Sequence, residues 1–461
     1  MTIHNNMSRT ALWFRSLLLP DGGADGVRLV IRDGRIETLT KDTPAETGDE
    51  IHEIGLPGLP NLHSHAFQRG MAGLTEQRGA TADSFWTWRE AMYRFVDHMG
   101  PEEVEAIAAQ AFLEMLESGF TRVGEFHYVH HDPDGTPYAD IGELAARIAA
   151  AAGETGIALT LLPVFYLHAG FGGLPAVPGQ RRFINDTDRY GRLVDASRKA
   201  VSPLSDARVG IAPHSLRAAT PAEILEILPL ANGGPVHIHV AEQVKEVEDC
   251  LRWSGQRPLE LLLDRLPVDE RWCLVHATHV TEAESADIAA CGAVVGLCPI
   301  TEANLGDGIF PAQAFMERGG RFGVGSDSNV LIDAAEELRL LEYGQRLSLR
   351  TRNALARAPT PSVGRSLFDA ALAGGAQALG APSTLAVGQP ADLVSLKADD
   401  SALAHRQHDR WLDGWIFAGR RQTVDCVWRA GTRLVNGGRH IHRDAIGRRY
   451  RLALHKVLHQ S

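Results

Sequence analysis

The sequence predicts an α/β protein whose core is a (β/α)8 TIM-like barrel, with a small β-sandwich domain built from both chain ends. Short apolar runs alternate with longer helical stretches between about residues 56 and 380. The runs are continuous, which is typical of parallel strands covered on both faces. Eight such strand–helix units in a chain of 461 residues favour a closed barrel over an open sheet. The predicted strands are Leu56–Leu62, Thr121–Phe126, Ile157–Phe165, Ala207–Ala212, Pro235–Val240, Trp272–His276, Ala293–Leu297 and Arg321–Val324.

Signals for the start and end of helices lie between these predicted strands. Pro101 opens a helix that should end near Gly119. Thr220 and Thr281 are each followed three residues later by glutamate, which is the pattern of a capping box. Gly292 is expected to end the helix that Thr281 begins. This regular alternation predicts right-handed strand–helix–strand connections.

The two chain ends differ from the middle. Residues 11–54 and 385–440 contain strand-like runs separated by turns, and Asp33-Gly34 between two such runs is typical of a hairpin. We expect residues 1–57 and 381–461 to form the small β-sandwich domain together. Residues 58–380 should form the catalytic barrel, inserted between them.

Composition limits the classes of partner. The net charge of −11 and the pI of about 6.0 argue against nucleic acid or an anionic membrane, since both require clustered basic residues. No apolar stretch has the length of a membrane span, and the N-terminal residues lack the pattern of a secretory signal. The first six residues are interpreted as a dispensable tail, with either Met1 or Met7 as the true start. The five scattered cysteines are expected to be reduced thiols in a cytoplasmic protein.

Histidines at predicted strand ends point to a metal site. His63 and His65 follow the first predicted strand on one face, so they can bind one ion from the same side. His239 ends the fifth strand and Asp327 follows the eighth. In a barrel these ends form one rim, and three imidazoles with one carboxylate suit a Zn²⁺ ion that keeps a position open for water. Taken singly, His239 is better interpreted as a core histidine and Asp327 as a turn or cap residue. Taken together at the ends of strands one, five and eight, the residues favour a shared metal site over coincidence. His237 lies deeper in the strand and is given no ligand role.

Two further residues on this rim could perform acid–base chemistry. Glu242 lies just past His239, and His276 ends the sixth strand. A carboxylate beside a metal site can carry a proton to a leaving nitrogen, and a neighbouring imidazole can stabilise developing charge. The structural alternatives are an exposed carboxylate at a helix start for Glu242 and a histidine bonded to backbone for His276.

Four motifs carry a resemblance to the amidohydrolase superfamily that covers nearly the whole chain. They are Gly58–His65, His239–Glu242, His276–His279 and Gly325–Ser328. The sequence resembles the mononuclear deaminase branch, since no lysine stands at the end of the fourth strand and His214 is nearby instead. This resemblance implies a distorted barrel with a small β-sandwich, in a homodimer.

The resemblance also implies roles for the residues on the rim. One Zn²⁺ per subunit, or another divalent metal, would be bound by His63, His65, His239 and Asp327. Catalysis would fall to Glu242, His276 and Asp327. In this scheme Asp327 takes a proton from water, Glu242 delivers one to the leaving nitrogen, and His276 assists.

Shorter signatures are similar to those of the N-formimino-L-glutamate deiminase subfamily. They lie at residues 63–70, 84–94, 124–128 and 214–217. The likeness implies that a small anionic amidine is hydrolysed to N-formyl-L-glutamate and ammonia, as part of histidine degradation. It also implies that the glutamate portion is held by Gln68, Arg89, Tyr128, His214 and Arg217, and arginine suits the bidentate binding of carboxylates. For Arg89, packing on the helix surface beside Trp86 and Trp88 is a competing interpretation.

Three alternatives to this function stay open on the sequence. The first is an aminohydrolase acting on a purine, pyrimidine or triazine ring, which should have aromatic stacking and few arginines in its site. The second is a C–N hydrolase related to imidazolonepropionase or dihydropyrimidinase, which would release no ammonia. The third is a catalytically inactive binding protein of the same fold, which would bind no metal.

Overall fold

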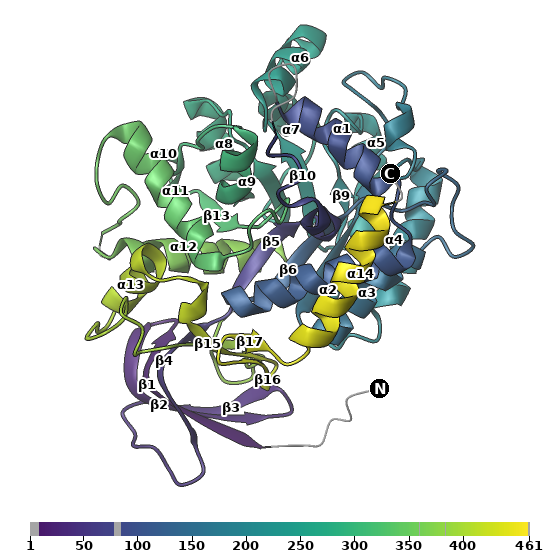
Figure 1. The fold of residues 1–461 in the computed structure, drawn as a ribbon. Coiled ribbons are helices and arrows are strands. Elements are labelled where there is room, and N and C mark those ends of the chain that lie inside the picture. The colour runs from purple at the N-terminus through teal and green to yellow at the C-terminus, as the bar shows by residue number, and fades with distance from the viewer. Residues whose placement is uncertain (1–8, 78–83, 359, 383, 460–461) are drawn as a thin grey trace.

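The computed structural model describes residues 9–77, 84–358, 360–382 and 384–459, so the start at Met1 or Met7 lies outside the described residues. Parallel strands form the centre of the molecule (Figure 1). In chain order they are β5 (Leu59–Ser64), β6 (Phe120–His127), β7 (Ala158–Phe165), β8 (Arg208–Val209) with β9 (Ala212–Pro213), β10 (Val236–Val240), β11 (Trp272–His276), β12 (Val294–Leu297) and β13 (Arg321–Val324).

The ring of strands is closed by short contacts between two hydrogen-bonded groups. Strands β5 to β9 form one group and β10 to β13 the other. Parallel bridges Ile211–Val236 and Ser215–His239 join the groups on one side, and the bridge Ser64–Asp327 joins them on the other. The predicted α/β class with parallel strands is therefore confirmed, and the closing bridges bring the ends of the first, fifth and eighth strands together.

Helices surround the strands and cover their outer faces (Figure 1). Of the predicted caps, Gly119 has a φ of 103° at the end of the second helix, and both Thr220 and Thr281 accept a hydrogen bond from the backbone N–H of the glutamate three residues on. The helices are α1 (Phe85–Val96), α2 (Pro101–Ser118), α3 (Glu143–Thr155), α4 (Thr187–Val201), α5 (Pro221–Ile227), α6 (Val244–Ser254), α7 (Pro258–Arg265), α8 (Glu282–Cys291), α9 (Pro299–Leu305), α10 (Ala312–Glu317), α11 (Ala334–Leu349), α12 (Val363–Ala378), α13 (Arg410–Ala418) and α14 (Arg443–His459).

Both chain ends contribute strands to one further sheet. Its order is β17-β16-β15-β14-β4-β1-β2-β3, and β4 joins the two halves by pairing with β1 and with β14. Asp33 and Gly34 form the turn of the predicted hairpin, with φ of 49° and 77°. The strands are β1 (Thr10–Leu19), β2 (Gly22–Arg32), β3 (Arg35–Thr40), β4 (Glu50–Pro57), β14 (Leu393–Leu396), β15 (Val424–Arg429), β16 (Thr432–Asn436) and β17 (Arg439–His440).

The last helix leaves this sheet and lies along the barrel. Helix α14 packs beside α2, where Lys456 Nζ lies 2.7 Å from Glu103 Oε1 (Figure 1). The segment after residue 381 therefore supplies strands to the small sheet and a helix to the outer layer of the barrel.

Two predicted strand ranges differ from the structure. The range Leu56–Leu62 spans the end of β4 and most of β5, because one apolar run serves two buried strands that belong to different sheets. The range Ala207–Ala212 is divided into β8 and β9. Between them Gly210 donates to Leu161 and Ile211 to the carbonyl of Pro235, so the backbone changes partner instead of continuing one ladder.

Two other sequence expectations can be compared directly with the structure. All five cysteines are free thiols, as expected. Within the described ranges, no helix combines the length and the apolar character needed to cross a membrane.

An ion-pair network with two buried arginines and a partly exposed carboxylate, Asp206, couples the small sheet to the barrel. Asp206 pairs with Arg122 of β6 at 2.6 Å and with Arg429 of β15, and Arg429 also pairs with Asp392 at 2.9 Å. The two arginines are each 6 % exposed. A buried charge is costly when its partner is removed, because the Coulomb attraction that offsets its desolvation is lost.

Asp206→Ala is therefore expected to lower the free energy of unfolding by about 2–4 kcal/mol, as measured in urea. Its control is Asp195→Ala, since Asp195 pairs with Arg198 at the surface and its side chain is 78% exposed. The control should change stability by less than about 0.5 kcal/mol. Equal effects of the two substitutions would contradict the proposed coupling.

Candidate active site

Four side chains from three strand ends meet at one point of the barrel rim. His63 lies in β5 and His65 just after it, while His239 lies in β10 and Asp327 follows β13. His63 Nε2 is 3.2 Å from His65 Nε2 and 3.1 Å from His239 Nε2. Asp327 Oδ1 is 3.4 Å from His63 Nε2 and 3.2 Å from His65 Nε2. The structure thus brings together all four predicted metal ligands, each of them buried.

Backbone carbonyls determine the tautomers of two of these histidines. The Nδ1–H of His65 donates to the carbonyl of Phe126 at 2.9 Å, and that of His239 donates to the carbonyl of His214 at 3.0 Å. A carbonyl can only accept, so the Nε2 atoms carry lone pairs. These lone pairs converge with the Asp327 carboxylate, and His63 Nε2 lies beside them, so the cluster offers the donor atoms that a divalent cation accepts.

The protonation of the histidines also fits a metal site. Burial lowers the pKa of His63 to about 3, and burial is also the main cause that lowers the pKa of His65 and of His239. The three rings are therefore neutral near pH 7, which is the form that binds a metal ion. Three imidazoles and one carboxylate suit Zn²⁺ and similar divalent ions.

An amide–hydroxyl network holds the two backbone segments that carry these ligands. Asn329 Nδ2 lies 3.0 Å from the carbonyl of His65 and 3.1 Å from that of Asp327, and Ser326 Oγ donates to Asn329 Oδ1 at 2.6 Å. Asp327 and Asn329 have φ of 42° and 55°, a region that few residues other than glycine adopt. The sequence analysis missed Asn329 and Ser326. The turn-rich sequence around Asp327 predicted a turn there, but it did not indicate that Asn329 bonds to the segment that follows β5.

The predicted acid–base residues face the same point. His276 Nε2 is 3.8 Å from Glu242 Oε1 and 3.8 Å from Asp327 Oδ2. Burial raises the pKa of Glu242 to about 7, although His276 and Arg217 oppose this shift. Burial disfavours the charged form of His276, but Glu242 and two other carboxylates outweigh it and raise the pKa of His276 to about 10. Near neutral pH, Glu242 can therefore both accept and donate a proton, while His276 is a donor.

A second glutamate holds the backbone that carries Glu242. Glu246 is fully buried in α6, and its carboxylate accepts the backbone N–H of Glu242 at 3.0 Å and that of Ala241 at 3.3 Å. Ala241 has a φ of 52°, so the chain turns sharply after β10. The sequence analysis missed Glu246, which lies four residues after Glu242 in the chain.

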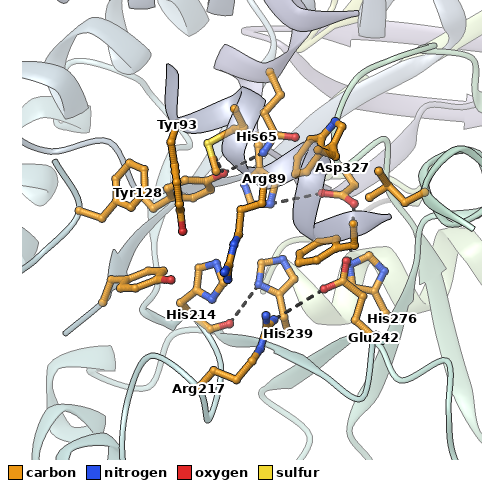
Figure 2. Close-up of a pocket in the computed structure, with 17 residues that line it drawn as sticks. His65, Arg89, Tyr93, Tyr128, His214, Arg217, His239, Glu242, His276 and Asp327 are labelled. Atoms are coloured by element: carbon orange, nitrogen blue, oxygen red, sulfur yellow. Dashed lines mark hydrogen bonds and ion pairs between the residues drawn. The ribbon is translucent and has the colours of Figure 1, made fainter. Parts of the chain in front are cut away.

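One cavity contains the centre and the predicted substrate residues (Figure 2). Every predicted site residue except His63 lines it. The lining also includes residues, most of them aromatic, that the sequence analysis did not select: Phe85, Trp88, Met92, Tyr93, Tyr166, Phe183 and Leu305.

Two arginines extend into this cavity from different elements (Figure 2). Arg89 of α1 lies over Trp86, with 4.5 Å between Cζ and the ring centroid. It also lines the cavity, so both interpretations of Arg89 hold at once. Arg217 Nη2 is 3.7 Å from Glu242 Oε2. Among the described residues, Arg89 Nε and Arg217 Nε and Nη2 are buried without a hydrogen-bond partner, so they are donors available to an anion.

The remaining predicted substrate residues lie beside them. Gln68 Nε2 donates to the hydroxyl of Tyr128 at 2.8 Å, whereas Gln68 Oε1 has no hydrogen-bond partner in the described part of the chain. His214 is half-buried, and desolvation followed by the charge of Arg217 lowers its pKa well below the ordinary value. One end of the cavity is thus cationic and the other carries the histidine–aspartate cluster.

A barrel with three histidines and an aspartate clustered at its rim is typical of metal-dependent hydrolases. Comparison of the sequence with family models identifies the family. The model of the amidohydrolase family matches residues 54–434, and the chain belongs to that family. Residues 10–53 match the N-terminal domain of formimidoylglutamate deiminase HutF. The chain is similar to formimidoylglutamate deiminase of Pseudomonas aeruginosa, with 53% identity over 454 residues that cover 97% of this chain and 100% of that protein.

Solved structures agree with this assignment. An amidohydrolase from Brucella melitensis is 54% identical, with a TM-score of 0.95 over 97% of this chain and 100% of that chain. An adenosine deaminase from Xanthomonas campestris with bound zinc has a TM-score of 0.80 at 23% identity, covering 98% of each chain. The second likeness concerns the fold alone.

Proposed function

We propose that this chain hydrolyses N-formimino-L-glutamate to N-formyl-L-glutamate and ammonia, a reaction of histidine degradation. One observation carries the proposal: the cavity that contains the histidine–aspartate cluster is also lined by two half-buried arginines, and each has buried donor nitrogens without a hydrogen-bond partner among the described residues. An amidine that bears two carboxylates matches both ends of such a cavity. The identity of 53% with a formimidoylglutamate deiminase supports the same reaction.

The metal would be held by His63, His65, His239 and Asp327, with one Zn²⁺ per subunit. Iron and manganese suit the same donors. When bound, such an ion supplies Lewis-acid chemistry that makes water acidic enough to react near neutral pH.

The chain's own residues would then manage the protons. Water adds to the formimino carbon while the Asp327 carboxylate accepts one of its protons. Glu242 gives a proton to the terminal nitrogen, because that nitrogen leaves as ammonia only after protonation. His276, a donor at neutral pH, stabilises the negative charge that develops near Asp327 and Glu242. As the C–N bond to the terminal nitrogen breaks, the proton held by Asp327 passes to that nitrogen, which leaves as ammonia. The hydroxyl proton of the adduct returns to Glu242, and the formyl C=O replaces the C=N bond.

The glutamate portion would lie at the cationic end. Arg217 and Arg89 bind the carboxylates, and Gln68, Tyr128 and His214 supply further hydrogen bonds. Arg217 is also close to Glu242, so a bound carboxylate shares this arginine with the acid–base residue.

Several broader features belong to the same proposal. We expect a cytoplasmic homodimer. Its small domain would be a β-sandwich formed by strands from residues 1–57 and 381–461, with residues 58–380 as the barrel. One apolar cluster supports the sandwich, since it unites Phe14 of β1 and Leu29 of β2 with Trp428 of β15, strands that lie apart in the sheet order.

Release of ammonia from defined substrates tests the function. The purified, metal-loaded protein should release ammonia from N-formimino-L-glutamate, and much less from guanine, cytosine or adenosine. N-formimidoylglycine has the same amidine but lacks the second carboxylate. It should react with a kcat/KM at least about 100-fold lower, since an arginine of the cavity then lacks the carboxylate that it would bind. Ammonia from a ring substrate but none from formiminoglutamate would overturn the proposal.

A further inference from the structure

We propose that Glu302 is a positioning residue that orients the imidazole of His276 toward the reacting atoms. The inference rests on the proposed function, in which His276 assists the reaction. Glu302 lies in α9, a short helix that follows β12, whereas His276 ends β11. The two side chains thus come from neighbouring strand–helix units. They meet on the side of the His276 ring that faces away from Glu242 and Asp327.

The contacts of Glu302 determine which ring nitrogen faces the cavity. Its Oε1 lies 3.2 Å from His276 Nδ1 and accepts the backbone N–H of Cys298 at 2.9 Å. Both side chains are buried, with 1% of His276 and 5% of Glu302 exposed. Glu302 Oε1 is already an acceptor in the contact with Cys298, so in its contact with the ring Nδ1 is the donor. Carboxylate–histidine pairs of this kind hold a ring in one tautomer and one orientation.

The other side of the ring shows why this orientation matters. With Nδ1 on Glu302, His276 Nε2 lies 3.8 Å from both Glu242 Oε1 and Asp327 Oδ2. A ring flip would replace this nitrogen with a carbon and remove the donor from between the two carboxylates. The backbone alone is a poor anchor, because His276 and Ala277 have φ of 69° and 47°, a conformation that persists only where neighbouring contacts enforce it.

Glu302 also has a simpler structural role, and the test must separate the two. By accepting the N–H of Cys298, it caps the start of α9. Glu337 of helix α11 provides a matched control. Its Oε2 accepts the N–H of Ile300 at 3.0 Å, and Ile300 lies in α9, the helix that Glu302 caps. Of the described contacts of Glu337, none involves His276.

A double-mutant cycle on the metal-loaded enzyme tests the inference. Glu302→Ala should lower kcat for formiminoglutamate about 100-fold with KM within threefold, and Glu302→Gln, which keeps an acceptor oxygen, should lower kcat only about 10-fold. In a His276→Asn background, either change should alter kcat by less than threefold. Glu337→Gln should stay within threefold of wild type.

Nitrogen-15 NMR of histidine-labelled protein gives a readout independent of turnover. The resonance lost in His276→Asn should report a protonated Nδ1 in wild type, and it should move in Glu302→Ala but not in Glu337→Gln. A wild-type kcat in both Glu302 variants, or equal losses with and without His276, would overturn the inference. If Glu302→Ala does not fold, the cycle is run with Glu302→Gln alone. Absence of wild-type turnover would instead overturn the proposed function, and the NMR result would still decide the role of Glu302.

Discussion

Glu242→Gln is expected to lower kcat for formiminoglutamate by about 10²–10⁴-fold while the bound metal stays near wild-type level. The glutamine side chain has the same volume, but it cannot accept a proton and pass it to the leaving nitrogen. Glu242 is not among the four clustered ligands, so its loss should leave metal binding intact. KM should change little, because Arg217 and Arg89 still bind the carboxylates.

Steady-state kinetics and elemental analysis of the same preparation check this expectation. Glu248→Gln is the matched control, since Glu248 lies in the same helix α6 and is exposed. The control should keep the wild-type kcat. Retention of full activity by Glu242→Gln would remove the proton-transfer role. Loss of metal in that variant would instead indicate that Glu242 acts as a ligand.

The metal cluster could be predicted because its geometry follows from topology. In a parallel barrel all strands run in the same direction, so their carboxyl ends share one rim. His63 and His239 are 176 residues apart in the chain, yet their Nε2 atoms lie 3.1 Å apart. The bridge between Ser64 and Asp327 brings the ends of the first and eighth strands together. No knowledge of loop conformation was needed for that prediction.

Residues whose role depends on a side-chain direction could not be predicted in this way. Glu302 is in a short helix after β12, and nothing in its neighbourhood in the sequence indicates that it reaches His276. Tyr93 and Tyr166 line the cavity because α1 and the segment after β7 pack over the rim, a tertiary arrangement without a local signal. The break between β4 and β5 inside the predicted strand Leu56–Leu62 was missed for a related reason, although the expected domain boundary lies at the same place. Apolar residues continue without a break from β4 into β5, because both strands are buried.

Metal binding should depend on His239 and not on His237, although both lie in β10 and share one strand face. His239→Ala removes an Nε2 lone pair that lies 3.1 Å from His63 Nε2, so the bound metal should fall well below one ion per chain. The loss of kcat should be at least about 10³-fold, since the metal contributes several kcal/mol to the reaction. Added Zn²⁺, Fe²⁺ or Mn²⁺ should not restore activity, whereas it should restore activity to wild type stripped with a chelator.

His237→Gln provides the comparison that separates ligation from general damage to the strand. His237 Nε2 donates to the carbonyl of Ala378 at 2.7 Å, deeper in the barrel, and takes no part in the cluster. This variant should lose some thermal stability, because a buried carbonyl loses a well-placed donor, but it should keep its metal. Elemental analysis and thermal unfolding of both variants measure the two effects separately. Stoichiometric metal in His239→Ala would refute the centre described here, and so would loss of metal in a folded His237→Gln protein, because ligation must then extend below the rim.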